Sequence, residues 1–178
     1  MSARRVAFGL GGNLGDIVGA LRGAVAWLSA HPLIEVVAVS SLYRTAPVGG
    51  PEQPDFLNAV VIAASDADPA RLLALAHEVE DTFGRTREVR WGPRTLDVDL
   101  LAVGDIVSDR PDLTLPHPRA HLRGFVLIPW AEVDPQFVVP GRGSVGQLAA
   151  SLPAQQRAGV VAVPAHGGSW YDDRAVTA

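Results

Sequence analysis

Two hydrophobic periods alternate along the chain, and their order predicts its secondary structure. Apolar residues at every second position, or in short continuous runs, are typical of strands, whereas apolar residues three and four apart are typical of amphipathic helices. Strand patterns cover Val6 to Leu10, Ile34 to Tyr43, Phe56 to Ala63 and the run from Thr95 to Leu101. Helical patterns cover Ile17 to Leu28, between the first two strands, and Leu72 to Phe83, between the last two.

Polar and helix-breaking residues mark the ends of these elements. Asp68 followed by Pro69 is typical of a helix start, and Gly84 stands where a helix C-cap belongs. Further along, we expect a helix from about Phe125 to Glu132 and a short helix through Leu152 that Ser144 caps. The segment from Pro153 is rich in alanine, glycine and glutamine, so we expect one domain over residues 1–152 and a loosely ordered tail over 153–178.

The order strand, helix, strand, strand, helix, strand predicts an α+β fold of the ferredoxin-like type. Its antiparallel sheet is expected to carry flanking helices on one face and to leave edges and loops free for a site. A dinucleotide-binding loop after the first strand is rejected, because a glycine fingerprint starting at Gly9 would need glycine at Leu14. Fold class alone does not name a function.

Two aspartates on one face of the last strand are the first chemical signal. Leu96, Val98 and Leu100 alternate with Thr95, Asp97 and Asp99, as in a half-buried strand. Neighbouring like charges on one face repel, so a purely structural strand has little reason to carry them. Carboxylate oxygens are the ligands that magnesium prefers, so a bound cation would reverse this repulsion.

Four arginines precede that strand, at positions 85, 87, 90 and 94. Guanidinium groups are always charged, and each one can donate hydrogen bonds to two phosphate oxygens at once. Either signal alone has a plainer explanation, since an Asp-x-Asp pair is common on solvent-exposed strands and an arginine-rich loop is more often solvated surface. Their combination beside a Trp-Gly-Pro turn favours a metal and phosphate site, as phosphoryl-group transfer requires.

Composition narrows the chemistry further. The 178 residues contain no cysteine and no lysine, which excludes thiolate chemistry, a P-loop lysine and Schiff-base mechanisms. The net charge of −4 argues against general nucleic-acid binding, and the apolar runs are too short to span a membrane. Without a signal-peptide pattern at the N-terminus, we expect a cytoplasmic protein with neither nucleic-acid nor membrane partners.

The segment between the second and third strands, Thr45 to Asp55, is longer than a hairpin requires. Its three prolines restrict the unfolded chain, which suits a loop that holds a defined shape. A functional loop and an ordered surface loop without function fit this pattern equally well.

Five motifs in register resemble the 6-hydroxymethyl-7,8-dihydropterin pyrophosphokinases of folate biosynthesis, from about Val6 to Pro140. The motifs are Gly11 to Asp16, Tyr43 to Pro47, Gln53 to Asn58, Arg90 to Leu101, and Pro116 to Arg119 together with Arg123 to Phe125. The resemblance implies an ATP-dependent diphosphotransferase. It would transfer pyrophosphate from ATP to the hydroxymethyl group of the reduced pterin and release AMP, and we expect it to act as a monomer.

The resemblance also implies roles for single residues. Asp97 and Asp99 would hold two Mg2+ ions that bridge the ATP phosphates, and Arg85 and Arg94 would neutralise the moving pyrophosphoryl group. The implied ATP contacts are Glu80, Trp91, Arg94, Thr114, His117 and Arg123. The implied pterin contacts are Thr45, Val48, Phe56, Asn58, Asp97 and Phe125, with the two phenylalanines stacking on the ring.

The chain departs from the family pattern at several positions. Gly12 replaces a usual serine, Ala46 stands where proline is common, and Asp112 stands where an arginine can contact ATP. The loop from Arg85 to Arg94 is one residue shorter than in some members, which leaves the role of Arg87 open.

Two other functions compete with this interpretation. A nucleotidyltransferase also uses Asp-x-Asp metals but attacks the α-phosphorus, and the Gly-Ser element that usually precedes such a site is absent here. A ferredoxin-like ligand-binding module would need no paired carboxylates. The products formed from ATP distinguish all three.

Overall fold

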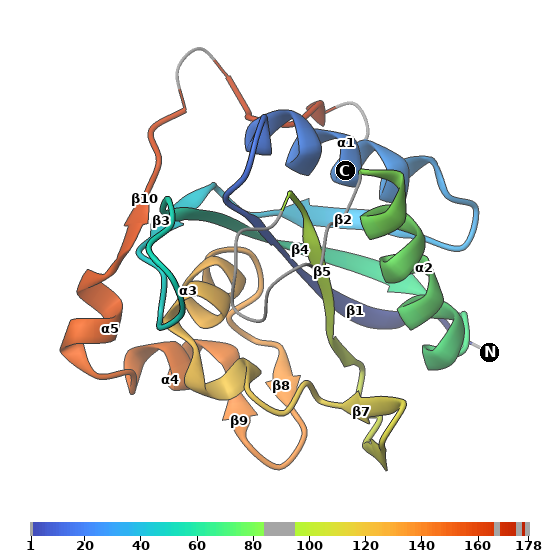
Figure 1. Cartoon of the computed structure of the whole chain (residues 1–178). Helices are drawn as coiled ribbons and strands as arrows, with labels where there is room; N and C mark the ends of the chain where they lie inside the picture. The colour runs from blue at the N-terminus through green and yellow to red at the C-terminus, as the bar shows by residue number, and fades with distance from the viewer. Residues whose placement is uncertain (1, 84–94, 166–167, 174–175, 177–178) are drawn as a thin grey trace.

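A six-stranded sheet forms the centre of the computed structural model, which describes residues 2–83, 95–165, 168–173 and 176 (Figure 1). The strands of this sheet are β1 (Arg4–Gly12), β2 (Glu35–Val39), β3 (Tyr43–Thr45), β4 (Phe56–Ser65), β5 (Asp97–Val103) and β10 (Val160–Ala162). They follow the order β10-β3-β4-β1-β5, and β2 also pairs with β4. All of these pairs are antiparallel.

This strand order confirms the predicted ferredoxin-like class. The long strand β4 pairs with β1 on one side and with both β2 and β3 on the other, so β2 and β3 share the place of one strand. The last strand of the predicted series, β5, pairs with β1. The result is the split βαβ arrangement, with strand β10 added at the edge.

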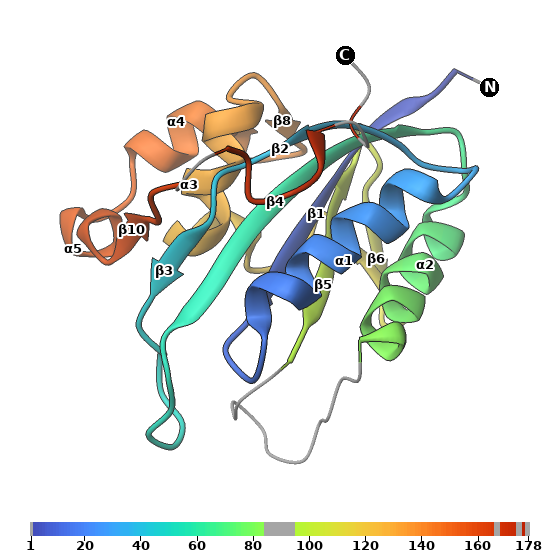
Figure 2. The ribbon, with the colours of Figure 1, turned by 90° about the horizontal axis from the view of Figure 1, so that it is seen from above.

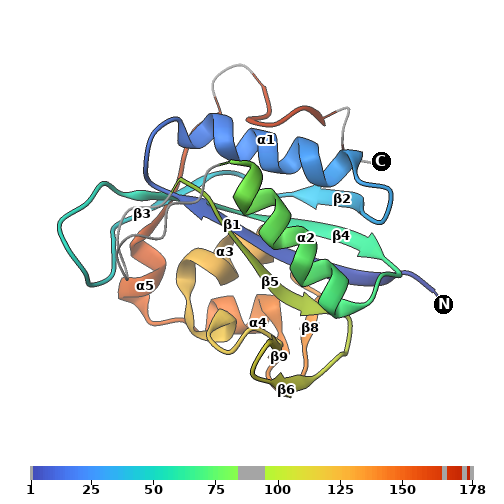
Figure 3. The ribbon, with the colours of Figure 1, turned by 45° about the vertical axis from the view of Figure 1, so that its right-hand side comes forward.

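Helices α1 (Ile17–Ala30) and α2 (Pro69–Thr82) lie side by side on one face of the sheet (Figure 3). Helix α2 begins at the predicted signal, where Asp68 accepts a hydrogen bond from the Ala70 amide ahead of Pro69. Helix α1 begins at a cap that was not predicted, where Asp16 accepts a hydrogen bond from the Gly19 amide. The apolar stripes of both helices pack on the sheet residues that point to this face, including Phe8, Val61 and Val98. The spacing of apolar residues therefore predicted this layer correctly.

The opposite face is also covered, so the expectation of helices on one face only was wrong (Figure 2). Here α3 (Gly124–Val133) and α4 (Val145–Ala150) pack on Val60 and Ile62 of β4, with Trp130 fully buried against Phe137. Because β4 is apolar at successive positions, both of its faces need a covering layer. The predicted bounds of α3 and the Ser144 cap of α4 are confirmed.

Short elements complete the described part of the molecule. They are the hairpin of β6 (Ser108–Arg110) and β7 (Leu113–Leu115), the 3-10 helix η1 (Ala120–Leu122), and the hairpin of β8 (Val138–Val139) and β9 (Gly143–Ser144). Among the helices described, none is both long and apolar enough to cross a bilayer.

The single strand predicted over Ile34 to Tyr43 is broken into β2 and β3. Ser40 lies at the break and is fully buried. Its hydroxyl accepts a hydrogen bond from the Val60 amide at 2.9 Å and donates one to the Ser41 carbonyl at 2.8 Å. A serine side chain that competes for backbone groups in this way ends regular pairing, which an alternating apolar pattern does not reveal.

Residues after Pro153 do not form a loose tail, at least as far as the structure describes them. Helix α5 (Ala154–Ala158) leads into β10, which pairs with β3, and the Val163 amide then donates to the Leu42 carbonyl. Trp170 donates its indole N–H to the Ser40 carbonyl at 2.8 Å and packs against the α1 side of the core. The composition predicted disorder because these short contacts carry no hydrophobic period.

Candidate active site

The register of three strands brings a pterin candidate and a metal candidate to the same end of the sheet. Gly11 of β1 pairs with Asn58 of β4 on one side and with Asp97 of β5 on the other. Residues directly opposite one another in a ladder point to the same face. Asn58 and Asp97 therefore share a face, with only a glycine between them.

Glycines also clear the space beside both aspartates. Gly9 pairs with Asp99 as Gly11 pairs with Asp97, so the β1 residue opposite each carboxylate has no side chain. A Cβ atom added at Gly11 would lie 2.8 Å from Asn58 Oδ1, which no ordinary contact allows. The floor of the site thus needs glycine at position 11.

The two aspartates lie where the strand pattern predicted them. Val98 and Leu100 are buried in the core under α1 and α2, and Asp97 and Asp99 are half-buried on the opposite face. This second face is the one that α3 covers further along the sheet. Both carboxylates thus lie on the same face as α3, beyond the part of the sheet on which this helix packs.

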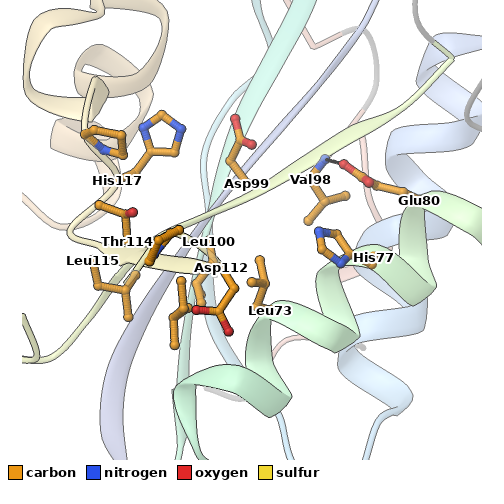
Figure 4. Close-up of a pocket in the computed structure, with 13 residues that line it drawn as sticks. Leu73, His77, Glu80, Val98, Asp99, Leu100, Asp112, Thr114, Leu115 and His117 are labelled. Atoms are coloured by element: carbon orange, nitrogen blue, oxygen red, sulfur yellow. Dashed lines mark hydrogen bonds between the residues drawn. The ribbon is translucent and has the colours of Figure 1, made fainter. Parts of the chain in front are cut away.

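Glu80 lies under the strand that carries the aspartates. Its side chain is 3% exposed, and its Oε1 accepts a hydrogen bond from the Val98 amide at 2.8 Å. The family resemblance implied Glu80 as an ATP contact. The structure places it on α2 at the wall of a cavity, where it bonds to the amide of Val98, the residue between the two aspartates in the sequence (Figure 4). In this position Glu80 fixes the start of β5 to α2.

A cavity of about 300 Å3 opens between α2, β5 and the segment from Pro111 to Pro118 (Figure 4). Its volume is within the range of small-ligand sites. The predicted ATP contacts that line it are Glu80, Thr114 and His117, together with Asp99. His77, which the sequence analysis missed, also lines it, from the same helix as Glu80.

His117 is a neutral hydrogen-bond donor in this site. Burial, and then the nearby cations Arg123 and Arg119, together lower its pKa to about 4. Its Nδ1 accepts a hydrogen bond from the Arg119 amide at 3.2 Å, so the proton of the neutral ring is on Nε2. Since the His117 amide is also bonded to the Leu101 carbonyl, the ring is tied to β5.

Asp112, which stands where the family resemblance led us to expect an arginine, is paired with a neighbouring residue of its own hairpin. Its carboxylate binds Arg110, with the closest contact at 2.6 Å, and this pairing lowers the pKa of Asp112. Thr114 donates its hydroxyl to the Arg110 carbonyl at 3.1 Å, so the turn of this hairpin is held by its own side chains.

The predicted pterin contacts lie around the start of β4. Thr45 pairs with Phe56, and the buried Asn58 donates its amide N–H to Thr45 Oγ1 at 2.9 Å. Phe125 lies in the first turn of α3, half-buried, with the Arg123 guanidinium 5.5 Å from its ring centre. Val48 is 82% exposed in the loop before β4.

Asn13 connects the two loops beside this region. Its amide donates to Gln53 Oε1 at 3.0 Å and to the Pro54 carbonyl at 2.9 Å, and its side chain is almost fully buried. The loop from Thr45 to Asp55 is therefore anchored to the loop that follows β1. The motif containing Asn13 was noted in the sequence, but its contact with Gln53 was not predicted.

The arginine-rich loop and its tryptophan lie outside the described residues. The predictions for Arg85, Arg87, Arg90, Trp91 and Arg94 fall on residues 84–94 and stay predictions.

The fold and the site together define an α+β domain with a small-molecule site at one end of its sheet. Residues 7–135 match the family model described as 7,8-dihydro-6-hydroxymethylpterin-pyrophosphokinase. The chain belongs to this family.

Relatives agree with this assignment, and a solved structure agrees with the fold. A 2-amino-4-hydroxy-6-hydroxymethyldihydropteridine pyrophosphokinase of Mycobacterium leprae is 45% identical over 170 residues, covering 88% of this chain and 87% of the relative. One from Bacillus subtilis is 46% identical over 127 residues, covering 71% and 76%. The crystal structure of Plasmodium falciparum HPPK-DHPS with pteroate matches with a TM-score of 0.66 at 11% identity, over 83% of this chain and 44% of that one, and supports the fold alone.

Proposed function

We propose that this chain performs its family's reaction by in-line attack of the pterin hydroxyl on the β-phosphorus of ATP. As a pyrophosphokinase, the protein is an ATP-dependent diphosphotransferase of folate biosynthesis, acting on ATP and 6-hydroxymethyl-7,8-dihydropterin. The register that sets Asn58, Gly11 and Asp97 side by side carries this proposal, because it places the proposed pterin-binding amide beside a proposed magnesium-binding carboxylate without a side chain between them.

The cavity at β5 suits the nucleotide. Asp99, Thr114 and His117 line it, and neutral His117 offers the N–H of Nε2 to a phosphate oxygen. Arg123, whose charge lowers the His117 pKa, lies close enough to meet the same phosphates. Glu80 lines the same cavity, and we propose that it contacts ATP as well as fixing β5 to α2.

The paired aspartates suit magnesium that arrives with ATP. Across the described residues, no group of three or more His, Cys, Asp or Glu side chains could hold a metal. Magnesium is commonly held by one or two carboxylates plus substrate phosphates and water, so Asp97 and Asp99 fit that role. We propose two ions, which when bound would stabilise charge on the phosphates.

The pterin is proposed to lie between Phe56 and Phe125. Aromatic rings favour stacking on a flat heterocycle. The amide of Asn58, fixed by Thr45, offers its carbonyl oxygen toward the ring edge, and the backbone of Thr45 and Val48 adds polar contacts. Asp97 adjoins this position through the strand register and would contact the pterin as well as the metal.

The transfer replaces one bond of the β-phosphorus by another. The pterin hydroxyl oxygen bonds to the β-phosphorus and releases its proton to water, while the bond from that phosphorus to the oxygen bridging it to the α-phosphorus breaks and AMP leaves. Positioning and charge neutralisation do most of the work in such transfers, so no strong general base is needed. Arg85 and Arg94 are proposed to neutralise the moving group, and Trp91 to help close the site.

Truncation of the proposed stacking residue tests the pterin position. Phe56→Ala is expected to weaken pterin binding by roughly 1–3 kcal/mol, as for bases stacked on aromatic side chains, and to leave ATP affinity near the wild-type value. Titration of each substrate measures both affinities. Equal losses for the two ligands, together with a lower melting temperature, would instead mean that Phe56 supports the fold.

A further inference from the structure

Glu132, near the end of α3, binds three donors of the segment between β2 and β3. Its Oε1 accepts hydrogen bonds from the Ser41 amide at 2.9 Å and from the Ser41 hydroxyl at 2.8 Å. Its Oε2 accepts one from the Tyr43 hydroxyl at 2.7 Å. These bonds join residues 89 and 91 positions apart in the sequence, so they connect the helix directly to the strand.

The hydrogen bonds of Glu132 replace strand pairing that is lost at the break between β2 and β3. Ser41 lies between β2 and β3, where regular strand pairing with β4 stops. Burial, and then the hydrogen bond to Glu132, raise the pKa of Tyr43, so its hydroxyl stays protonated and remains a donor. Glu132 therefore provides a fixed link at the point where β3 begins.

The face of α3 that carries Glu132 and the face of β3 that carries Tyr43 both extend to the proposed pterin position. Residues seven apart share one face of a helix, so Phe125 lies on the Glu132 face of α3, about 10 Å toward its start. Residues two apart share one face of a strand, so Thr45 lies on the same face of β3 as Tyr43. Tyr43 is also paired directly with Asn58.

We propose that Glu132 is a positioning residue for the pterin, setting the distance between Phe125 on α3 and the Thr45–Asn58 pair on β3 and β4. The proposal rests on the proposed function, because it takes these residues to bind the pterin. Glu132 lies about two helical turns from Phe125 and acts through the elements that it joins.

A second tether at the same end of α3 makes a matched control possible. Asp134 accepts two hydrogen bonds from Arg5, both at 2.9 Å, and so links the end of α3 to β1. Removing either carboxylate loosens the end of the helix, but only Glu132 connects it to β3. A general loss of stability would affect both variants, whereas a positioning effect is expected in one.

Steady-state kinetics of Glu132→Ala, Tyr43→Phe, their double variant and Asp134→Ala test the proposal. We expect the KM for 6-hydroxymethyl-7,8-dihydropterin to rise about three- to tenfold in Glu132→Ala, with kcat and the KM for ATP within about twofold of the wild type. Tyr43→Phe should give part of this increase. The double variant should show no larger increase than Glu132→Ala, because both changes remove the same link. Asp134→Ala should keep the wild-type pterin KM.

Hydrogen exchange of the ligand-free protein gives a readout independent of turnover. The amides of Tyr43 to Thr45 should exchange faster in Glu132→Ala but not in Asp134→Ala. Two results would overturn this proposal alone, provided that the wild-type enzyme forms AMP. One is an unchanged pterin KM in Glu132→Ala, and the other is an equal increase of the pterin KM in Glu132→Ala and Asp134→Ala. A wild type that forms no AMP from ATP and the pterin would remove the proposed function and this proposal with it.

Discussion

Replacing Asp97 or Asp99 by asparagine is expected to leave the fold intact and to abolish most magnesium-dependent turnover. Both side chains are half-buried on the face of β5 that points away from α1 and α2, and asparagine matches their shape, so the core on the other face is unchanged. The loss of a carboxylate ligand removes metal charge from the phosphates, which should raise the barrier by several kcal/mol. A barrier increase of about 4 kcal/mol corresponds to roughly a thousandfold loss in kcat.

Asp105→Asn is the control for this pair, because Asp105 lies in the turn after β5 on the same strand connection. Turnover is measured over a magnesium titration, with circular dichroism to verify the fold. Near-normal kcat in both Asp97→Asn and Asp99→Asn would contradict a catalytic role for the carboxylates.

Gly11→Ala is expected to reduce kcat/KM for the pterin by about a hundredfold, because a displacement of about 1 Å at a substrate contact has effects of this size. The added Cβ would lie 2.8 Å from Asn58 Oδ1, so the buried amide must shift. The KM for ATP should change much less, since the cavity proposed for the nucleotide is lined by α2, β5 and the β7 segment.

Gly9→Ala is the matched control for the pterin KM. It adds the same methyl group two residues earlier on β1, where the nearest atoms are those of Leu101 at 3.4 Å, an ordinary contact distance. A wild-type kcat/KM for the pterin in Gly11→Ala would show that Asn58 does not need its observed position.

The fold was predictable where one face of an element is buried. The stripes of α1 and α2 and the alternation around Asp97 and Asp99 follow from burial on a single face. The break at Ser40 and the docking of Trp170 were not predictable, because both depend on single hydrogen bonds between residues far apart in the sequence. Short contacts of this kind leave no hydrophobic period.

The site was predictable as a set of residues but not as a geometry. The motifs named Asn58, Asp97 and His117, and the structure puts each near the same end of the sheet. Gly9 and Gly11 leave space beside the two aspartates because they lie opposite them in the strand register. This register can be read from the sequence only after the strand pairing is known. Glu80 was expected to touch ATP, and its bond to the Val98 amide could not be foreseen.

The most direct test of the account is the product analysis of one reaction. ATP, magnesium and 6-hydroxymethyl-7,8-dihydropterin are mixed with the protein, and the phosphorus-containing products are identified by NMR and chromatography. Attack on the β-phosphorus predicts AMP and the pterin diphosphate in equal amounts. ADP would mean simple phosphoryl transfer, free pyrophosphate would mean nucleotidyl transfer, and unconsumed ATP would mean a binding module; each of these results would contradict the account.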